Sequence, residues 1–443
     1  MTKIFTSILL MMISFSLSFG QKSTFYKDVA PIIYSKCSSC HRPGEAAPFS
    51  LLSYEDVAKR GSFIKDVVQS GYMPPWKADN HYTSVPFSEN KSLTDKEKKT
   101  IIDWIDDKMP AGNKNPSVNT ILKKYKEGTA YSRKPDTTLN VATPFKIKGD
   151  SQDRFIIFRI PFSFASTQNV EALEFVSKNK AAIHHANFAI YDVDEGIDIN
   201  SGPAVINNTL NERAGDDFGQ FDKFKKNMAY YGGWIPGSDY ESFPKGMGWV
   251  MPKRGVILLT LHYAPLGKDE IDFSGVNFFF TKEPVKRVVE LINLGSGGIA
   301  ERDITPYFRI PADSIRKFEL KIKNPKKQTM LAVWPHMHLL GKSFKSYAIT
   351  GSGDTLKLIS IPKWDFNWQN IYRYQKPLIV PENSTLVIEA VYDNTVNNPK
   401  NPRNPPVSVY GSGEMKSIDE MMTLIILYLP YKEGDENLLL NAK

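Results

Sequence analysis

Six of the seven histidines of this chain lie in four short motifs, and the first of these motifs constrains the fold most. It reads Cys37-Ser38-Ser39-Cys40-His41, and the chain contains no cysteine other than Cys37 and Cys40. In a C-x-x-C-H motif the two thiols attach to the vinyl groups of a haem, and the following histidine becomes the proximal ligand of its iron. The alternative is a disulfide or a dithiol redox pair that happens to precede a histidine. Because His41 stands at the required offset in an exported chain, we favour covalent haem c.

The N-terminal segment indicates export. Lys3 provides a positive charge, residues 4–19 are apolar or small, and Ser18 and Gly20 are small residues of the kind that a signal peptidase reads. An uncleaved anchor is the alternative, but the apolar run is shorter than the roughly 20 residues that span a bilayer. We expect a cleaved signal peptide at residues 1–20, a periplasmic or secreted protein, and no stable membrane insertion after cleavage.

Length and composition favour a soluble chain of about three domains. The 443 residues are 41% hydrophobic and 23% charged. The net charge of +8 comes from 56 lysines and arginines against 48 acidic residues, and the basic residues are spread out rather than gathered in an arm. We therefore expect a solvated surface and no nucleic-acid partner.

Residues 22–112 are expected to form a small all-α domain. Apolar residues at helical spacing lead into the C-x-x-C-H motif, and Ser53 is a candidate N-cap for a second helix. Thr94 and Glu97 form a capping box that opens a third helix, which ends near residues 110–112. The first two helices carry the apolar residues Val29, Ile32 and Ile33, and Val57, Ile64, Val67 and Val68. Three helices around one haem resemble a small class I cytochrome c.

That resemblance extends to residues 71–76, Gly-Tyr-Met-Pro-Pro-Trp, which are similar to the loop that supplies the methionine ligand in such cytochromes. Met73 is therefore expected to be the sixth ligand of the iron. A thioether is a soft neutral ligand that raises the reduction potential, as suits electron transfer. The alternatives are that Met73 is a core residue, or that His81 in the next polar loop takes this position.

The rest of the chain is predicted to be β-structure. Residues 113–138 look like a linker, rich in Asn, Lys, Ser and Pro. After them come short runs of Val, Ile, Phe and Tyr separated by turn residues, at 154–162, 186–192, 256–263, 276–280, 318–322 and 386–392. We expect two all-β, jelly-roll-like sandwich domains at 139–287 and 288–443, with a boundary uncertain within residues 283–294.

Five histidines lie on or beside these strands and form a candidate set of metal ligands. His336 and His338 are two positions apart, so on a strand their side chains point the same way, about 7 Å apart along the backbone. His184 and His185 would point to opposite faces of a regular strand, so they can share a metal only at a bulge or a strand end. His262 lies in the apolar run at 258–263. Nitrogen ligands alone leave zinc, copper, iron or nickel open, and a single histidine on an apolar strand is often a core residue.

These segments resemble the ligand segments of the copper type II, ascorbate-dependent monooxygenases, the family of dopamine β-monooxygenase and the peptide-amidating monooxygenase. The segments are His184-His185, Leu261-His262-Tyr263, residues 336–342 (His-Met-His-Leu-Leu-Gly-Lys) and Asp419-Glu420-Met421, which we place in the final strand. The similarity covers about residues 141–430 and keeps the family's order. It implies two copper sites facing a solvent-filled cleft. His184, His185 and His262 would hold the electron-storing copper, and His336, His338 and Met421 would hold the catalytic, oxygen-binding copper.

The third ligand of the second site has competitors in Met415 and Met422. A thioether favours Cu(I), the oxidation state that meets dioxygen. Met422 should face away from Met421, so that at most one of the two reaches the metal. The family pattern favours Met421.

The chain also departs from the family. No cysteine remains for the disulfides of the animal enzymes, and Trp334 occupies the position at which the peptide-amidating enzymes carry an arginine that binds a peptide carboxylate. This makes peptide amidation doubtful and favours a neutral or apolar small substrate. Trp334 and Phe344 are candidate pocket walls, although both are equally compatible with the core.

Together these features predict an exported copper-dependent monooxygenase that uses dioxygen to hydroxylate a C–H bond of a small organic substrate. Its coppers would be reduced through the covalent haem c, which would itself receive electrons from a periplasmic donor. The alternatives are a haem and copper electron-transfer or copper-binding protein without oxygenase activity, and a β-region whose histidines are only core residues.

Overall fold

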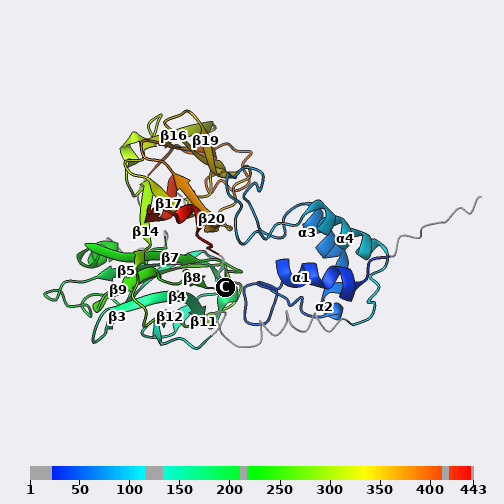
Figure 1. The fold of residues 1–443 in the computed structure, drawn as a ribbon. Coiled ribbons are helices and arrows are strands. Elements are labelled where there is room, and N and C mark those ends of the chain that lie inside the picture. Colours follow the sequence, from blue (N-terminus) through cyan, green and yellow to red (C-terminus); the bar gives the residue numbers. More distant parts are fainter. Residues whose placement is uncertain (1–21, 115–132, 210–216, 239, 412–418, 441–443) are drawn as a thin grey trace, which may run out of the picture.

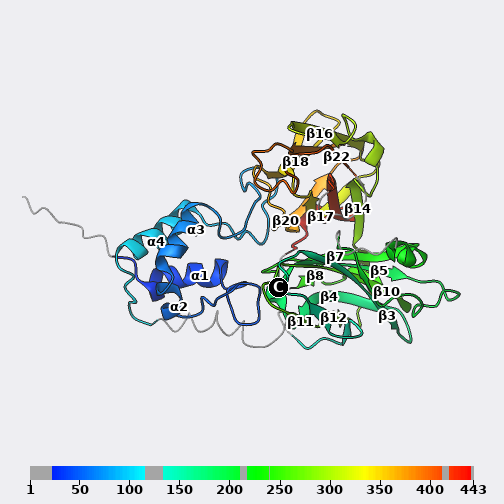
Figure 2. The same cartoon turned by 180° about the vertical axis from the view of Figure 1, so that it is seen from behind.

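The computed structural model describes residues 22–114, 133–209, 217–238, 240–411 and 419–440. The predicted signal peptide at 1–20, most of the predicted linker, and Met415 lie outside these residues. Figure 1 shows a helical N-terminal part beside two β parts, with the second β part stacked on the first; Figure 2 shows the same arrangement from behind. In the described residues, no helix combines the length and the apolar character that crossing a membrane requires.

The helical part is small and has its own core. Its elements are η1 (Phe25–Val29), α1 (Ala30–Lys36), α2 (Tyr54–Ala58), α3 (Gly61–Gln69) and α4 (Asp95–Asp106). Phe25, Ile33, Ile64 and Trp104 are buried together between them. The Ser53 side chain accepts a hydrogen bond from the Asp56 N–H at the start of α2, and both bonds of the capping box between Thr94 and Glu97 are present at the start of α4.

The prediction of one long second helix after Ser53 is wrong. The chain forms two helices instead, α2 and α3, because it leaves helical geometry at Arg60, whose ψ is 14°. The side chain of Arg60 lies over the ring of Phe49, 4.5 Å from its centroid. The break turns the apolar face of α3 so that Ile64 and Val68 are buried in the helical core.

The first β part consists of two sheets packed face to face. One sheet has the order β1-β12-β4-β9-β13, with β8 paired to β4, and the other has the order β6-β3-β10-β5-β7. The strands of the first sheet are β1 (Thr137–Asn140), β4 (Gln168–Ser177), β8 (Glu241–Ser242), β9 (Met247–Met251), β12 (Ser274–Phe280) and β13 (Arg287–Val288). The strands of the second are β3 (Arg154–Ser163), β5 (Ile183–Asp192), β6 (Val205–Asn207), β7 (Asn227–Trp234) and β10 (Arg254–Tyr263). The short pair β2 (Phe145–Ile147) and β11 (Glu270–Asp272) lies beside them.

The sheet that contains β3, β5 and β10 is covered on both faces. One face packs against the other sheet, with Phe158, Phe188 and Leu259 in the shared core. The opposite face is covered by η3 (Asp217–Phe224), whose Phe221 and Phe224 are buried. Coverage on both sides explains why these strands are apolar almost without alternation.

The second β part repeats this two-sheet plan. The sheets have the orders β14-β23-β17-β20 and β16-β21-β18-β19, and a short pair joins β15 to β22. The strands are β14 (Glu290–Gly295), β15 (Arg309–Ile310), β16 (Ile315–Lys323), β17 (Gln328–His336), β18 (Gly341–Ile349), β19 (Thr355–Ile361), β20 (Tyr372–Val380), β21 (Thr385–Asp393), β22 (Val409–Tyr410) and β23 (Thr423–Pro430). The last helical turn is η5 (Asp435–Asn437). The predicted β-sandwich architecture and the six predicted strands are confirmed.

Not all of residues 22–112 pack within the helical part. Ala78, Val85 and Phe87 are buried in the core of the second β part, and Phe87 forms a β-bridge with Tyr374 on β20. The Asp79 N–H also donates to the Ser360 carbonyl at 2.8 Å. Val85 and Phe87 are two positions apart and both are buried in the core of the second β part, so the end of this segment packs there rather than in the small helical core.

Candidate haem and metal sites

The C-x-x-C-H motif opens onto a cavity of about 430 Å³. Cys37 follows α1, and Cys40 and His41 lie in the turn after it. The two thiols are not joined by a disulfide, and burial raises the pKa of the Cys37 thiol to about 12. The Nδ1 atom of His41 donates to the Phe49 carbonyl at 3.1 Å. This bond fixes the tautomer that leaves Nε2 as the acceptor, while burial lowers the pKa of His41.

All three parts of the molecule line this cavity. Met73 lines it together with Cys37, Cys40 and His41, whereas His81 is exposed and is not one of the lining residues. The first β part contributes Ile183, His184, Pro236 and Ala264, and the second β part contributes Trp368. The cavity therefore ends directly against one of the predicted metal ligands.

His184, His185 and His262 come together at the ends of β5 and β10, and we call them the first histidine cluster. His262 pairs with His185 across the two strands, but Tyr263 pairs with Ile183, so His184 is the extra residue of a β-bulge. The ring centroid of His262 lies 4.8 Å from that of His184 and 4.9 Å from that of His185. The bulge that the adjacent pair requires for a shared ion is thus present.

A carboxylate that the sequence analysis did not identify joins this cluster. His262 Nε2 donates to Asp153 Oδ1 at 2.8 Å, and His184 Nδ1 lies 3.8 Å from the same oxygen. One ligand atom each from Asp153, His184 and His262 lie within 4.8 Å of one another. Asp153 immediately precedes β3, the neighbour of β10, so only the pairing of these two strands brings it to His262.

The electrostatics of the first cluster favour neutral imidazoles. Burial, assisted by the nearby His262, lowers the pKa of His184 to about 4, and burial together with four neighbouring imidazoles lowers the pKa of His185 well below its usual value. Burial alone would raise the pKa of Asp153, but the hydrogen bond from His262 lowers it on balance. The Nδ1 atoms of His184 and His262 are buried and have no hydrogen-bond partner among the described residues.

His336 and His338 form the second histidine cluster at the end of β17. Their Nε2 atoms face each other at 3.1 Å. The Nδ1 atom of His338 donates to the Asp419 carbonyl at 2.8 Å, and the Nδ1 atom of His336 donates to Gln369 Oε1. The amide of Gln369 is itself oriented, since its Nε2 donates to the Phe366 carbonyl at 2.9 Å. Both imidazoles therefore carry their proton on Nδ1 and direct Nε2 lone pairs at the same point.

The segment Asp419-Glu420-Met421 supports this cluster from just before β23, and not from within the final strand as predicted. Glu420 is fully buried and accepts hydrogen bonds from the backbone N–H groups of His338 at 2.9 Å and Leu340 at 2.6 Å. Burial raises its pKa to about 8. Met422 is buried in the core of the second β part, whereas Met421, which is also buried, is not one of the residues of that core.

Residues 364–370, which we call the bridging loop, connect the cavity beside the C-x-x-C-H motif with both histidine clusters. The ring centroid of Phe366 lies 6.2 Å from that of His185, 5.9 Å from that of His262 and 5.8 Å from that of His338. Trp368 lines the cavity, and Gln369 accepts the bond from His336. The resemblance implied a solvent-filled cleft between the clusters, but this buried phenyl ring lies against imidazoles of both.

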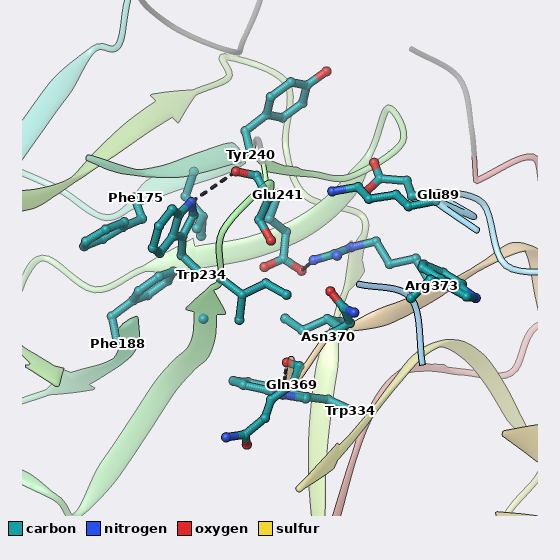
Figure 3. A pocket seen from close by; sticks show the side chains of 17 residues that line it. Glu89, Phe175, Phe188, Trp234, Tyr240, Glu241, Trp334, Gln369, Asn370 and Arg373 are labelled. Carbon is teal, nitrogen blue, oxygen red and sulfur yellow. Dashed lines mark hydrogen bonds and ion pairs between the residues drawn. The ribbon is translucent and has the colours of Figure 1, made fainter. Parts of the chain in front are cut away.

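Trp334 and Phe344 take different places. Phe344 is 1% exposed in the core of the second β part, so of the two alternatives given for this residue the core one holds. Trp334 does line a cavity between the two β parts, together with Gln369, Glu241 and Arg373 (Figure 3). There Arg373 on β20 forms a 2.9 Å ion pair with Glu241 on β8. Gln369 lines this cavity and accepts the hydrogen bond from Nδ1 of His336. The cavity therefore lies on the Nδ1 side of His336, not on the side of the facing Nε2 atoms.

Comparisons with known proteins add nothing to this geometry. No family model and no curated protein matches the chain. The solved structures that match include the major capsid protein P2 of bacteriophage PM2, with 9% sequence identity, coverage of 67% of this chain and 98% of that one, and a TM-score of 0.21. The VP2 subviral particle of infectious bursal disease virus has 10% identity, covers 74% of this chain and 89% of that one, and has a TM-score of 0.15. Such low scores support no conclusion about this chain.

Proposed function

We propose that this protein is an exported copper-dependent monooxygenase whose coppers are reduced through a covalently bound haem c. The observation that carries the proposal is the pair of facing Nε2 atoms of His336 and His338, 3.1 Å apart, with both Nδ1 protons donated elsewhere. Two lone pairs this close repel each other unless a proton or a cation lies with them. Metal-binding histidines typically donate their second nitrogen in this way to a carbonyl or a carboxylate.

The first histidine cluster also fits a metal ion. The unpartnered, buried Nδ1 atoms of His184 and His262 are costly unless something binds them. Asp153 accepts the hydrogen bond from Nε2 of His262. It thereby provides the second-sphere carboxylate that raises the basicity of a ligand histidine. Neutral imidazoles suit copper in both oxidation states, and the thioether of Met421 at the second cluster would favour Cu(I).

The cavity beside the C-x-x-C-H motif fits a haem. Cys37 and Cys40 would form the covalent attachment, with His41 and Met73 as axial ligands. Hydrogen bonding to the Phe49 carbonyl holds the His41 ring in one orientation. Because His184 also lines this cavity, the haem would lie against the first histidine cluster.

When bound, the coppers would supply two electrons to reduce dioxygen, so that one oxygen atom enters a substrate C–H bond. The protein's own residues orient the ligand nitrogens: Asp153 holds His262, Gln369 holds His336, and Glu420 holds the backbone around His338. Phe366 excludes water from the space beside both clusters. With Trp334 in place of a carboxylate-binding arginine, a neutral or apolar small molecule remains the expected substrate class.

Oxygen uptake by copper-loaded, haem-reduced protein against a panel of small aromatic and aliphatic compounds tests this function. We expect substrate-dependent uptake that His338→Ala abolishes, together with one haem and two coppers per chain in the wild-type protein. Copper binding without substrate-dependent uptake would instead indicate an electron-transfer or copper-binding protein. Absence of tight copper would show that the histidines are only core residues.

A further inference from the structure

We propose that Trp368 and Gln369 of the bridging loop carry electrons from the haem directly to the second histidine cluster, without passage through the first. This inference rests on the proposed function and adds a route to it. Each copper would then be reduced from the same haem by its own path, the first cluster through His184 and the second through Trp368 and Gln369.

The direct route is almost entirely covalent. Trp368 lines the cavity that Cys40, His41 and Met73 also line. One peptide bond separates Trp368 from Gln369, whose side-chain oxygen accepts the hydrogen bond from His336 Nδ1. An electron that enters the indole therefore reaches a ligand of the second cluster through bonds and one hydrogen bond.

A route between the two clusters through Phe366 crosses gaps. Phe366 approaches His262 and His338 with centroid separations of 5.9 and 5.8 Å, and these contacts are van der Waals contacts only. Electronic coupling falls off more steeply across such gaps than along covalent bonds. Within the bridging loop, the path from Trp368 through Gln369 to His336 therefore offers better coupling than the path through Phe366.

The bridging loop is held so that Trp368 and Gln369 keep these positions. Trp364 Nε1 donates to the His338 carbonyl at 3.2 Å, and Gln369 Nε2 donates to the Phe366 carbonyl at 2.9 Å. Asp365 pairs with Lys77 at 3.4 Å and with Lys400 at 2.7 Å. These contacts fix the loop to the helical part and to the second β part at once.

The electron balance needs one reductant. A ferrous haem that passes one electron through Trp368 becomes ferric, and the Cu²⁺ ion at His336 and His338 becomes Cu⁺. An external one-electron donor then restores the ferrous haem, and a second electron reduces the copper of the first cluster through His184. No order between the two copper reductions is imposed.

The test removes a histidine of the first cluster and follows electron transfer from the haem to copper at the second cluster alone. His262→Ala, with His185→Ala as a second background, is loaded with copper, and haem and copper contents are measured first. The haem is reduced with a photoreductant in a laser flash without oxygen, and its reoxidation is followed by absorbance, with loss of the Cu²⁺ signal followed by electron paramagnetic resonance. We expect first-order reoxidation that persists in both backgrounds, is absent without copper, and slows at least tenfold when Trp368→Leu is added.

Two controls distinguish a route from a general disturbance. Trp368→Phe, which keeps an aromatic ring on the cavity wall, should retain most of the rate. Trp249→Phe removes a tryptophan that stacks on Tyr230 in the core of the first β part and does not line this cavity, and it should leave the rate unchanged. A redox titration of the haem corrects each rate for driving force.

The result that overturns the inference is loss of haem reoxidation in both backgrounds while copper remains at the second cluster. An unchanged rate in Trp368→Leu overturns it as well. A protein that binds neither haem nor copper would already fail at the content measurement, and this would remove the proposed function together with the inference.

Discussion

At the scale of single residues, Asp153 determines which nitrogen of His262 is available to a metal. It accepts the Nε2 proton at 2.8 Å, which leaves the Nδ1 lone pair as the one that could bind a metal ion. Loss of such a second-sphere partner typically lowers metal affinity roughly 10–100-fold. We expect Asp153→Asn to weaken copper at the first cluster by about this factor, and the exposed Glu195→Gln to leave it unchanged. Chelator competition measures both, and equal affinities would exclude this role for Asp153.

The pKa values of His184 and His336 predict how metal-free protein responds to acid. Burial lowers both pKa values to about 4, whereas the unfolded chain titrates near pH 6.5. Between these values the unfolded state binds more protons, so the free energy of unfolding must fall as the pH falls from about 6.5 towards 4. Urea unfolding at pH 7 and pH 5 measures this. His336→Gln, which cannot titrate, should show a smaller difference, and the same difference would contradict the prediction.

At the scale of secondary-structure elements, the local sequence pattern predicts which strands and helices form. It does not predict which of their side chains come into contact. Alternating and apolar runs located six strands, because the burial of a strand is reflected in the apolar residues of the strand itself. The capping residues Ser53 and Thr94 were readable for the same reason. Asp153 and Gln369 were not, since each reaches its histidine only after distant strands pair or a loop folds back. For the adjacent pair His184-His185, the sequence showed only that a shared metal ion requires a bulge or a strand end. It did not show that the bulge is present.

The connection between β17 and the segment before β23 is an element-scale feature that can be tested. Glu420 accepts from two buried N–H groups of residues 338–340, and losing both bonds leaves two unsatisfied donors, at about 1–3 kcal/mol each. Glu420→Ala should therefore destabilise the protein clearly more than Glu420→Gln, which keeps one acceptor oxygen. Chemical denaturation of both variants measures the difference. Equal losses would mean that the segment is held by other contacts.

At the scale of the whole molecule, the helical part touches both β parts, but the kind of contact differs between the two. Phe87 joins it to β20 of the second β part by backbone pairing and stacks on Tyr374, with ring centroids 5.3 Å apart. Against the first β part, a Cβ added at Gly237 would lie 2.5 Å from Cys40 Sγ, so only glycine permits this approach. The cavity beside the C-x-x-C-H motif is lined by residues of all three parts, so it is complete only when all three are in place.

An ion pair between Glu45 and Lys180 joins the helical part to the first β part beside this cavity. Its atoms lie 3.0 Å apart, and the side chains are 10% and 13% exposed. Arg42 also pairs with Glu45, so Lys180→Met leaves the carboxylate partly compensated rather than isolated. We expect a double-mutant cycle of Lys180→Met and Glu45→Gln to give a coupling energy of about 1–3 kcal/mol in urea unfolding.

The single variant Lys180→Met should also slow electron transfer from the haem to the first cluster, because docking beside His184 becomes looser. The pair Lys146 and Asp269, at 2.8 Å on the surface of the first β part, is the matched control. Its side chains are 69% and 57% exposed, so solvent and salt screen the interaction and the same cycle should give no measurable coupling. If the two cycles gave the same result, this ion pair would not hold the parts together, and the helical part would be held against the first β part by other contacts, such as the close approach of Gly237 to Cys40.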